Sequence, residues 1–118
     1  MILEQKGKPG IIPRLWRHFF IGKMEYTKRK WKSKRNSILL RAGYMDEIEK
    51  RYGKAVEATT VHHIFPAETY PEFAFEDWNL IALSAENHNR CHIRGSHELT
   101  EFGESLKKIA MQRRPAPF

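Results

Sequence analysis

The sequence predicts an α+β fold, in which a strand–loop–strand–helix core is flanked by helices on its N- and C-terminal sides. Two short apolar segments, residues 58–61 and 80–83, have strand character. On both sides of them, apolar residues recur at helical spacing between capping residues and glycines. The 118 residues, 41% of them apolar, suffice for one small domain.

A capping residue and a glycine bound the helix expected before the first strand. Thr27 is a candidate N-cap for a helix that continues to about Arg41, and Gly43 would end it. A separate short helix is expected over residues 15–21, with a basic amphipathic membrane helix as the alternative. The residues of the longer helix that we expect to face inward are Trp31, Ile38 and Leu39.

Three more helices are expected along the rest of the chain. Residues 45–52 carry Met, Ile and Tyr at helical spacing, and Gly53 would close that helix. Ser84 is a candidate N-cap for a helix over about 85–93. Thr100 would open the last helix, whose shared apolar face consists of Phe102, Leu106 and Ile109. The polar and aromatic connection between the two strands is too long for a tight hairpin and is expected to be an ordered loop.

The positive charge is concentrated near the N-terminus. Residues 1–42 hold 12 lysines and arginines against 2 acidic residues, whereas residues 43–118 hold 9 against 12, for a net charge of +7. The densest basic stretch, residues 28–35, is expected to bind the phosphate backbone of nucleic acid. Residues 1–24 are expected to form a basic arm or short helix, and residues 25–118 the folded domain. The candidate phosphate contacts are Lys28, Lys30, Lys32, Lys34 and Arg35.

Several classes of protein are excluded by composition. The single cysteine, Cys91, excludes an internal disulfide and a zinc site built from several cysteines. No apolar run approaches the roughly 20 residues of a membrane span, and the N-terminus does not resemble a signal peptide. We therefore expect a cytoplasmic protein. Of its histidines, His18 and His97 are expected to be structural or surface residues.

Four of the six histidines fall within residues 62–92, and their spacing indicates a metal site. His62 would end the first strand, and His88 and His92 are four residues apart, so on a helix they would share one face. Three protein ligands leave positions for water and a phosphate oxygen, which is typical of a catalytic metal. Three neutral imidazoles favour Zn²⁺, Ni²⁺ or Co²⁺, whereas Mg²⁺ prefers oxygen ligands. Cys91 is an alternative ligand in place of His92.

Three motifs resemble those of the HNH endonucleases, also called ββα-metal nucleases. They read HHIFP (62–66), NLIAL (79–83) and HNRCH (88–92), in the order and at the spacing of that family. The likeness is strongest to small bacteriophage HNH proteins, and the paired histidines also resemble the nuclease domains of DNase colicins. The resemblance implies a ββα-metal core at about residues 58–94.

The resemblance also implies a role for each motif residue. His63 would be the general base, and Asn79 would tie the loop and orient His63. His88 would be a catalytic metal ligand, with His62 and His92 completing the ligand set. The implied activity is hydrolysis of DNA phosphodiester bonds with one divalent ion, which could be Mg, Mn, Ni, Co or Zn. The implied partner is double-stranded DNA, cut by a monomer in the bacterial host cytoplasm, and the phage proteins suggest genome packaging beside a terminase.

One departure qualifies the resemblance. Many phage HNH proteins carry two Cys-x-x-Cys pairs that bind a structural zinc, and their positions here are occupied by Asp46, Glu49, Ser84 and Asn87. No structural zinc is therefore expected, and ordinary packing would replace it through Trp31, Met45, Ile48 and Leu83. The alternatives to a phage-type endonuclease are a non-catalytic, metal-stabilised DNA-binding module and a toxin-type DNase. Arg90 and Arg94 are further candidate contacts to DNA phosphates.

Overall fold

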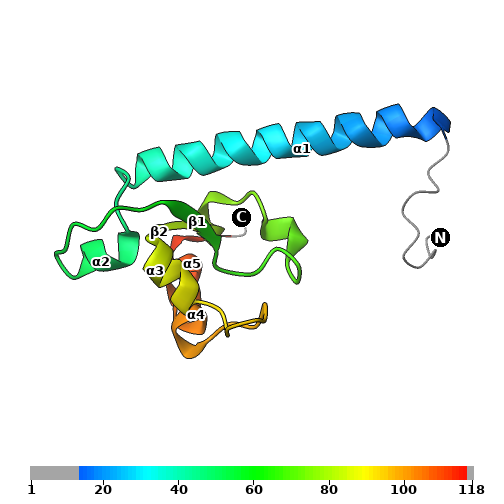
Figure 1. Cartoon of the computed structure of the whole chain (residues 1–118). Helices are drawn as coiled ribbons and strands as arrows, with labels where there is room; N and C mark the ends of the chain where they lie inside the picture. The colour runs from blue at the N-terminus through cyan, green and yellow to red at the C-terminus, as the bar shows by residue number, and fades with distance from the viewer. Residues whose placement is uncertain (1–13, 117–118) are drawn as a thin grey trace. The chain divides into compact units, whose positions relative to one another are not determined.

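The computed structural model describes the backbone of residues 14–116 and the side chains of residues 27–116. The chain divides into two units, residues 1–32 and 33–118, and the first helix begins in one and ends in the other. All other elements belong to the second unit (Figure 1). In chain order they are α1 (Arg14–Arg41), α2 (Glu47–Arg51), β1 (Thr60–His63), the 3₁₀ turns η1 (Pro71–Phe73) and η2 (Asp77–Asn79), β2 (Leu80–Leu83), α3 (Ala85–Arg90), α4 (Glu101–Ser105) and α5 (Lys107–Arg113).

Helix α1 is longer than predicted. Thr27 lies inside it and does not cap it, so the predicted start is wrong, and the separate helix expected over residues 15–21 is part of α1. Carrying the helix through Gly22 costs only about 1 kcal/mol, which is less than ending one helix and nucleating another. The side-chain packing of residues 15–21, and residues 1–13 of the expected N-terminal arm, lie outside the described residues. Gly43, with φ +65°, follows the end of α1 as predicted.

The two strands form an antiparallel sheet. Thr60 pairs with Leu83 and His63 with Leu80, so His62 lies opposite Ile81. Helix α3 packs on both strands, and α2 contacts β2 (Figure 1). The expected loop between the strands contains the two 3₁₀ turns, and α5 contacts the second of these.

The edge of β2 that faces away from β1 is hydrogen-bonded by side chains. Glu47 Oε2 accepts from the Ala82 N–H at 2.8 Å, and Arg41 Nη2 donates to the Leu80 carbonyl at 3.0 Å. A buried strand edge needs such partners because unpaired backbone groups are costly. The end of α1 and the start of α2 thereby hold the sheet.

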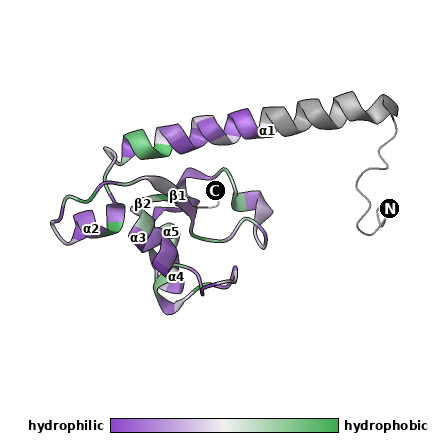
Figure 2. Ribbon diagram, in the orientation of Figure 1, coloured by the Kyte–Doolittle hydropathy of each residue, from purple (hydrophilic) through white to green (hydrophobic). Residues whose placement is uncertain are grey.

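The core lies between the sheet and the C-terminal helices. Its centre includes Ile64, Ile81, Leu83 and Leu106, all almost completely buried. The described part of α1 is mostly hydrophilic, with hydrophobic residues near its C-terminal end (Figure 2). Of the residues predicted to face inward, Ile38 and Leu39 are buried and Trp31 is half-buried. Within the described part of the chain, no helix has the length and apolar character needed to cross a membrane.

The single C-terminal helix predicted after Thr100 is in fact two helices that meet at Leu106. The Thr100 side chain caps α4 by accepting from the Gly103 N–H at 3.1 Å, as expected of an N-cap. The chain turns at Leu106, whose carbonyl accepts from the Ile109 N–H in a tighter, three-residue turn. Leu106 and Ile109 remain buried and Phe102 is half-buried, so the apolar face is largely preserved.

Candidate functional site

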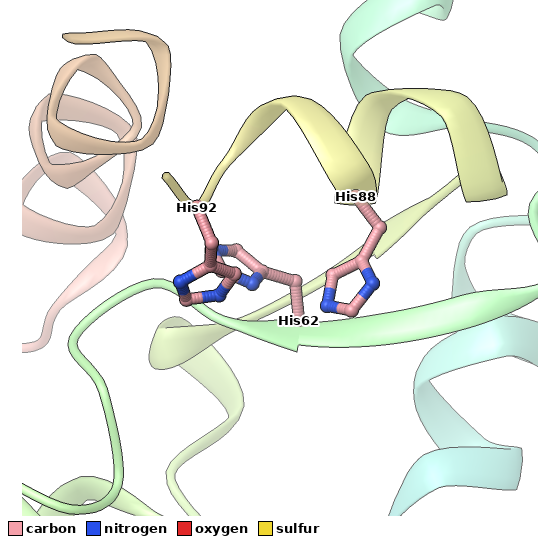
Figure 3. A group of neighbouring side chains, drawn as sticks. All are labelled: His62, His88 and His92. Carbon is pink, nitrogen blue, oxygen red and sulfur yellow. The ribbon is translucent and has the colours of Figure 1, made fainter. Parts of the chain in front are cut away.

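Three histidines from two elements point toward one another (Figure 3). His62 comes from β1, His88 from α3, and His92 follows α3. One ring nitrogen of each lies within 4.8 Å of one nitrogen of each of the others. The ring centroid of His62 is 5.4 Å from that of His88 and 5.4 Å from that of His92. This spacing suits three ligands of a single metal ion.

His92 does not lie on a helix, contrary to prediction. Helix α3 ends at Arg90, and His92 instead pairs with Leu99 in an isolated β-bridge. The residue between, Cys91, keeps a helical backbone (φ −76°, ψ −25°) and donates its N–H to the His88 carbonyl. The chain therefore completes one more turn, and His92 still arrives close to His88, with 6.0 Å between ring centroids.

The surroundings of His62 and His88 favour the neutral form of both rings. Burial, together with the nearby His88, His92 and His63, lowers the pKa of His62 to about 3. Burial, and then His92, also lowers the pKa of His88. Two of the three rings are therefore held in the neutral form at pH 7, and neutral imidazole is the form that binds a metal.

Two ring nitrogens are well placed to accept a metal. His62 is only 2% exposed, and its Nε2 is buried with no hydrogen-bond partner among the described residues. An unpaired buried nitrogen is costly unless something binds it. The Nδ1 of His92 lies 3.2 Å from the His97 carbonyl. Since a carbonyl only accepts, that Nδ1 carries the proton and leaves the lone pair on Nε2. The three histidines therefore fit a divalent metal.

His63 is oriented by a backbone carbonyl of the inter-strand loop. Its Nε2 lies 3.0 Å from the Ala74 carbonyl, so this nitrogen is the donor and Nδ1 holds the lone pair of the neutral ring. Burial lowers the pKa of His63, against the opposing effect of the Ala74 hydrogen bond. A neutral, oriented imidazole next to the histidine cluster has the chemistry of a general base.

Asn79 fastens both ends of the loop that carries Ala74. It is fully buried, and its Oδ1 accepts from the Phe65 N–H at 2.7 Å. Its Nδ2 donates to the carbonyls of Phe65 and Phe73, both at 3.1 Å. Because Phe73 immediately precedes Ala74, Asn79 restrains the carbonyl that orients His63.

Cys91 is a packing residue in this structure. It is fully buried in the core, and burial raises its pKa to about 11, with Arg90 opposing and Asp46 adding to the shift. Its Sγ donates to the Asn87 carbonyl at 3.3 Å. A thiol held protonated in this way is a poor ligand. The side chain of His97 is exposed, as expected of a surface residue. Its carbonyl, which contacts His92 Nδ1, has a role at the site that the sequence did not indicate.

The predicted phosphate contacts are distributed over both units. Lys28, Lys30 and Lys32 are exposed and belong to the first unit, whereas the histidines belong to the second. Lys34 forms an ion pair with Asp77 at 2.6 Å. The remaining candidates, all in the second unit, are the half-buried Arg35 and the exposed Arg90 and Arg94.

Arg90 is held in place by two contacts. Its Nη1 donates to Asn87 Oδ1 at 2.8 Å, and its guanidinium carbon lies 4.1 Å from the centre of the Phe102 ring. A cation over an aromatic face is stabilised by the ring quadrupole. The side chain remains exposed, so a fixed positive charge lies two residues from His88 and His92.

Hydrogen bonds join the four positions at which the resemblance would place zinc-binding cysteines, which are Asp46, Glu49, Ser84 and Asn87. Asp46 contacts the backbone of Glu49 and Ser84 and the side chain of Asn87. The prediction of ordinary apolar packing is therefore incomplete. Ile48 and Leu83 do belong to the core, but Trp31 and Met45 are only half-buried. An N-cap signal, an aspartate before a run of helix-forming residues, could have singled out Asp46.

The fold is similar to that of a solved structure, the HNH endonuclease of the deep-sea thermophilic bacteriophage GVE2 with a manganese ion. The two chains are 22% identical, the TM-score is 0.53, and the match covers 67% of this chain and 89% of that one. No protein-family model and no curated protein matches the chain. The similarity confirms the predicted α+β architecture: the chain has the ββα-metal fold of the HNH endonucleases.

Proposed function

We propose that this protein is a metal-dependent endonuclease that hydrolyses phosphodiester bonds of double-stranded DNA. The observation that carries the proposal is the buried Nε2 of His62, which has no hydrogen-bond partner among the described residues and belongs to a cluster with His88 and His92 in an HNH fold. An inert core would have no reason to bring one buried and two half-buried imidazoles together. The fold alone does not determine an activity, so the argument rests on this cluster and on His63.

His62, His88 and His92 would hold one divalent ion. When bound, the ion would supply positive charge to neutralise a phosphate oxygen as negative charge grows in the transition state. Three nitrogen ligands favour Zn²⁺, Ni²⁺ or Co²⁺. The structural neighbour contains manganese, so Mn²⁺ belongs among the ions to be tested.

His63 would act as the general base. Its Nδ1 takes a proton from the water that attacks phosphorus, while its Nε2 keeps its hydrogen bond to the Ala74 carbonyl. Burial lowers the pKa of His63, which favours the neutral ring, the form that can accept a proton. Asn79 keeps the loop, and with it the base, in position.

The basic residues would bind the DNA backbone. Arg90 and Arg94 lie near the histidines in sequence and are exposed, and the lysines of residues 28–32 add positive charge from the first unit. These contacts would attract any DNA sequence, since phosphates carry no sequence information. A role in phage DNA packaging is supported only by the phage origin of the structural neighbour, and the gene neighbourhood tests it.

A plasmid-cleavage assay tests the proposal. Supercoiled DNA should be converted to relaxed or linear forms with Mn²⁺, Zn²⁺, Ni²⁺ or Co²⁺ and remain intact with EDTA, and His88→Ala should be inactive. His97→Ala is the matched control, because it removes an exposed imidazole but keeps the carbonyl that contacts His92. A wild-type protein that binds metal and DNA without cutting would instead be a non-catalytic DNA-binding module.

A further inference from the structure

A buried carboxylate, that of Asp46, connects α2 with the start of α3, the helix that carries His88. Asp46 is completely buried, and its Oδ1 accepts from the N–H groups of Ile48 and Glu49, each at 2.9 Å. Its Oδ2 accepts from the Ser84 N–H at 2.7 Å and from Asn87 Nδ2 at 2.9 Å. A carboxylate has about four lone-pair sites, and Asp46 uses each of them.

These hydrogen bonds join the start of α2 to the start of α3. Ser84 is the N-cap of α3, and Asn87 lies in its first turn. Asn87 also donates to Glu49 Oε2 at 3.0 Å and accepts from Arg90 Nη1 at 2.8 Å. The network therefore reaches from the N-cap of α3 to its last residue.

Asp46 is itself fixed by the backbone. Its N–H donates to the Val56 carbonyl at 2.7 Å, and its carbonyl accepts from the Lys50 N–H at 3.0 Å. The carboxylate thus has a rigid support on the α2 side. A buried charge that is fully hydrogen-bonded from a rigid support specifies one arrangement of its partners, because any other would leave the charge unpaired.

Helix α3 depends on such external contacts. It has six residues, and a helix of that length is unstable in isolation. His88 directly follows Asn87, and its N–H donates to the Ser84 carbonyl at 2.9 Å. Ser84, whose carbonyl accepts the His88 N–H, and Asn87, which precedes His88, are therefore both bound to Asp46.

We infer that Asp46 is a positioning residue for the histidine centre: its carboxylate fixes Ser84 and Asn87, and thereby holds α3 where His88 meets His62 and His92. The inference rests on the proposed function only in requiring that the three histidines bind a metal. Asp46 would thus set the geometry of the three ligands without being a metal ligand itself.

Asp46→Asn tests the inference, because the side chain keeps its shape but exchanges one acceptor oxygen for an amide donor. Whichever way the amide turns, two N–H donors then face an NH₂ group. Titration of the purified full-length protein with Co²⁺, in a calorimeter and by visible absorption, should show Kd raised about tenfold or more, as for other residues that support metal ligands. The cobalt spectrum, which reports ligand geometry, should also change. Asp77→Asn makes the same chemical change at an exposed site and should leave both unchanged.

The result that overturns the inference is a variant that melts at a lower temperature but, when measured well below that temperature, keeps the wild-type Kd and cobalt spectrum. Asp46 would then stabilise the fold without setting the site. Should Asp46→Asn not fold, Asn87→Ala removes the second contact of the same network while keeping the carboxylate, and the same two outcomes apply. Because the readout is metal affinity, a protein that binds Co²⁺ but does not cut DNA would contradict the proposed function alone.

Discussion

Replacing Gly103 by alanine tests how tightly α4 holds the segment that carries His92. A Cβ at residue 103 would lie less than 3.0 Å from the Cys91 carbonyl oxygen and 3.1 Å from Leu99 Cδ2. Normal C···O contacts begin at about 3.3 Å, so the two backbones must separate by nearly an ångström. That same oxygen accepts the Thr100 N–H at 2.9 Å, which limits its freedom to move.

Two opposing effects decide whether Gly103→Ala raises or lowers the stability of the protein. Alanine is favoured over glycine in a helix by about 1 kcal/mol, whereas overpacking a tight site costs about 1–3 kcal/mol. The steric cost should prevail at Gly103 because the obstructing atom belongs to a hydrogen-bonded backbone and not to a flexible side chain. We expect Gly103→Ala to lower the stability of the metal-free protein by about 1–2 kcal/mol, and each kcal/mol lowers Tm by roughly 4–8 °C for a domain of this size.

Thermal unfolding in EDTA measures the loss of stability. Metal affinity should fall as well, because Cys91 directly precedes His92, and calorimetric titration with Zn²⁺ measures that loss. Ser105→Ala, an exposed change in the same helix, is the control and should stay near the wild type. A Tm equal to or above that of the wild type would refute the reasoning, since it would mean that the helix gains from alanine without meeting Cys91.

Three further outcomes are expected. His88→Ala should abolish both metal binding and cleavage, and His92→Ala should weaken both, as measured by calorimetry and the plasmid assay. Full metal affinity in a variant that carries both substitutions would rule out the assigned metal site. The stabilisation that Asp46 contributes should be present above pH 3.8 and disappear as the pH falls through its folded-state pKa. Burial would raise that pKa, but hydrogen bonds from Ser84, Glu49 and Asn87 lower it overall. Urea unfolding should therefore show the gap between wild type and Asp46→Asn closing below pH 3.8, and a constant gap would argue against that shift. Three lysines of the first unit, Lys28, Lys30 and Lys32, can be replaced with glutamine. DNA binding should then weaken for all sequences, and the slope of log K against log salt should fall by about 0.9 for each true phosphate contact. An unchanged slope would mean that these lysines form a solvated surface.

The sequence predicted the strands and the convergence of the histidines because both follow from local spacing. Side chains alternate along a strand, which puts His62 on one side of the sheet. His88 and His92 are four residues apart, so one turn of the chain brings them to the same face even where the helix ends between them. The end of α3 at Arg90 therefore changed the secondary structure around His92 without removing it from the cluster. Capping residues were less decisive, since Thr27 has the chemistry of an N-cap but lies within α1.

The groups that orient the imidazoles could not be predicted from residue types. His63 and His92 are held by the carbonyls of Ala74 and His97, and every residue has a carbonyl. The Asp46 network was hidden for a different reason: its contacts join residues about forty positions apart, where no sequence periodicity applies. A structure was needed to show that this position holds a hydrogen-bonded carboxylate.

The central claim, that a metal held by three histidines works with a separate histidine base, is tested most directly by His63→Ala. Single-turnover cleavage of DNA and calorimetric titration with the same metal should be measured on one preparation of the variant. General-base catalysis typically contributes about 10²–10⁴-fold, so we predict a loss of that size in the cleavage rate with a metal Kd close to that of the wild type. Loss of metal binding would make His63 a ligand, and cleavage at the wild-type rate would show that the base is another group; either result would contradict the account.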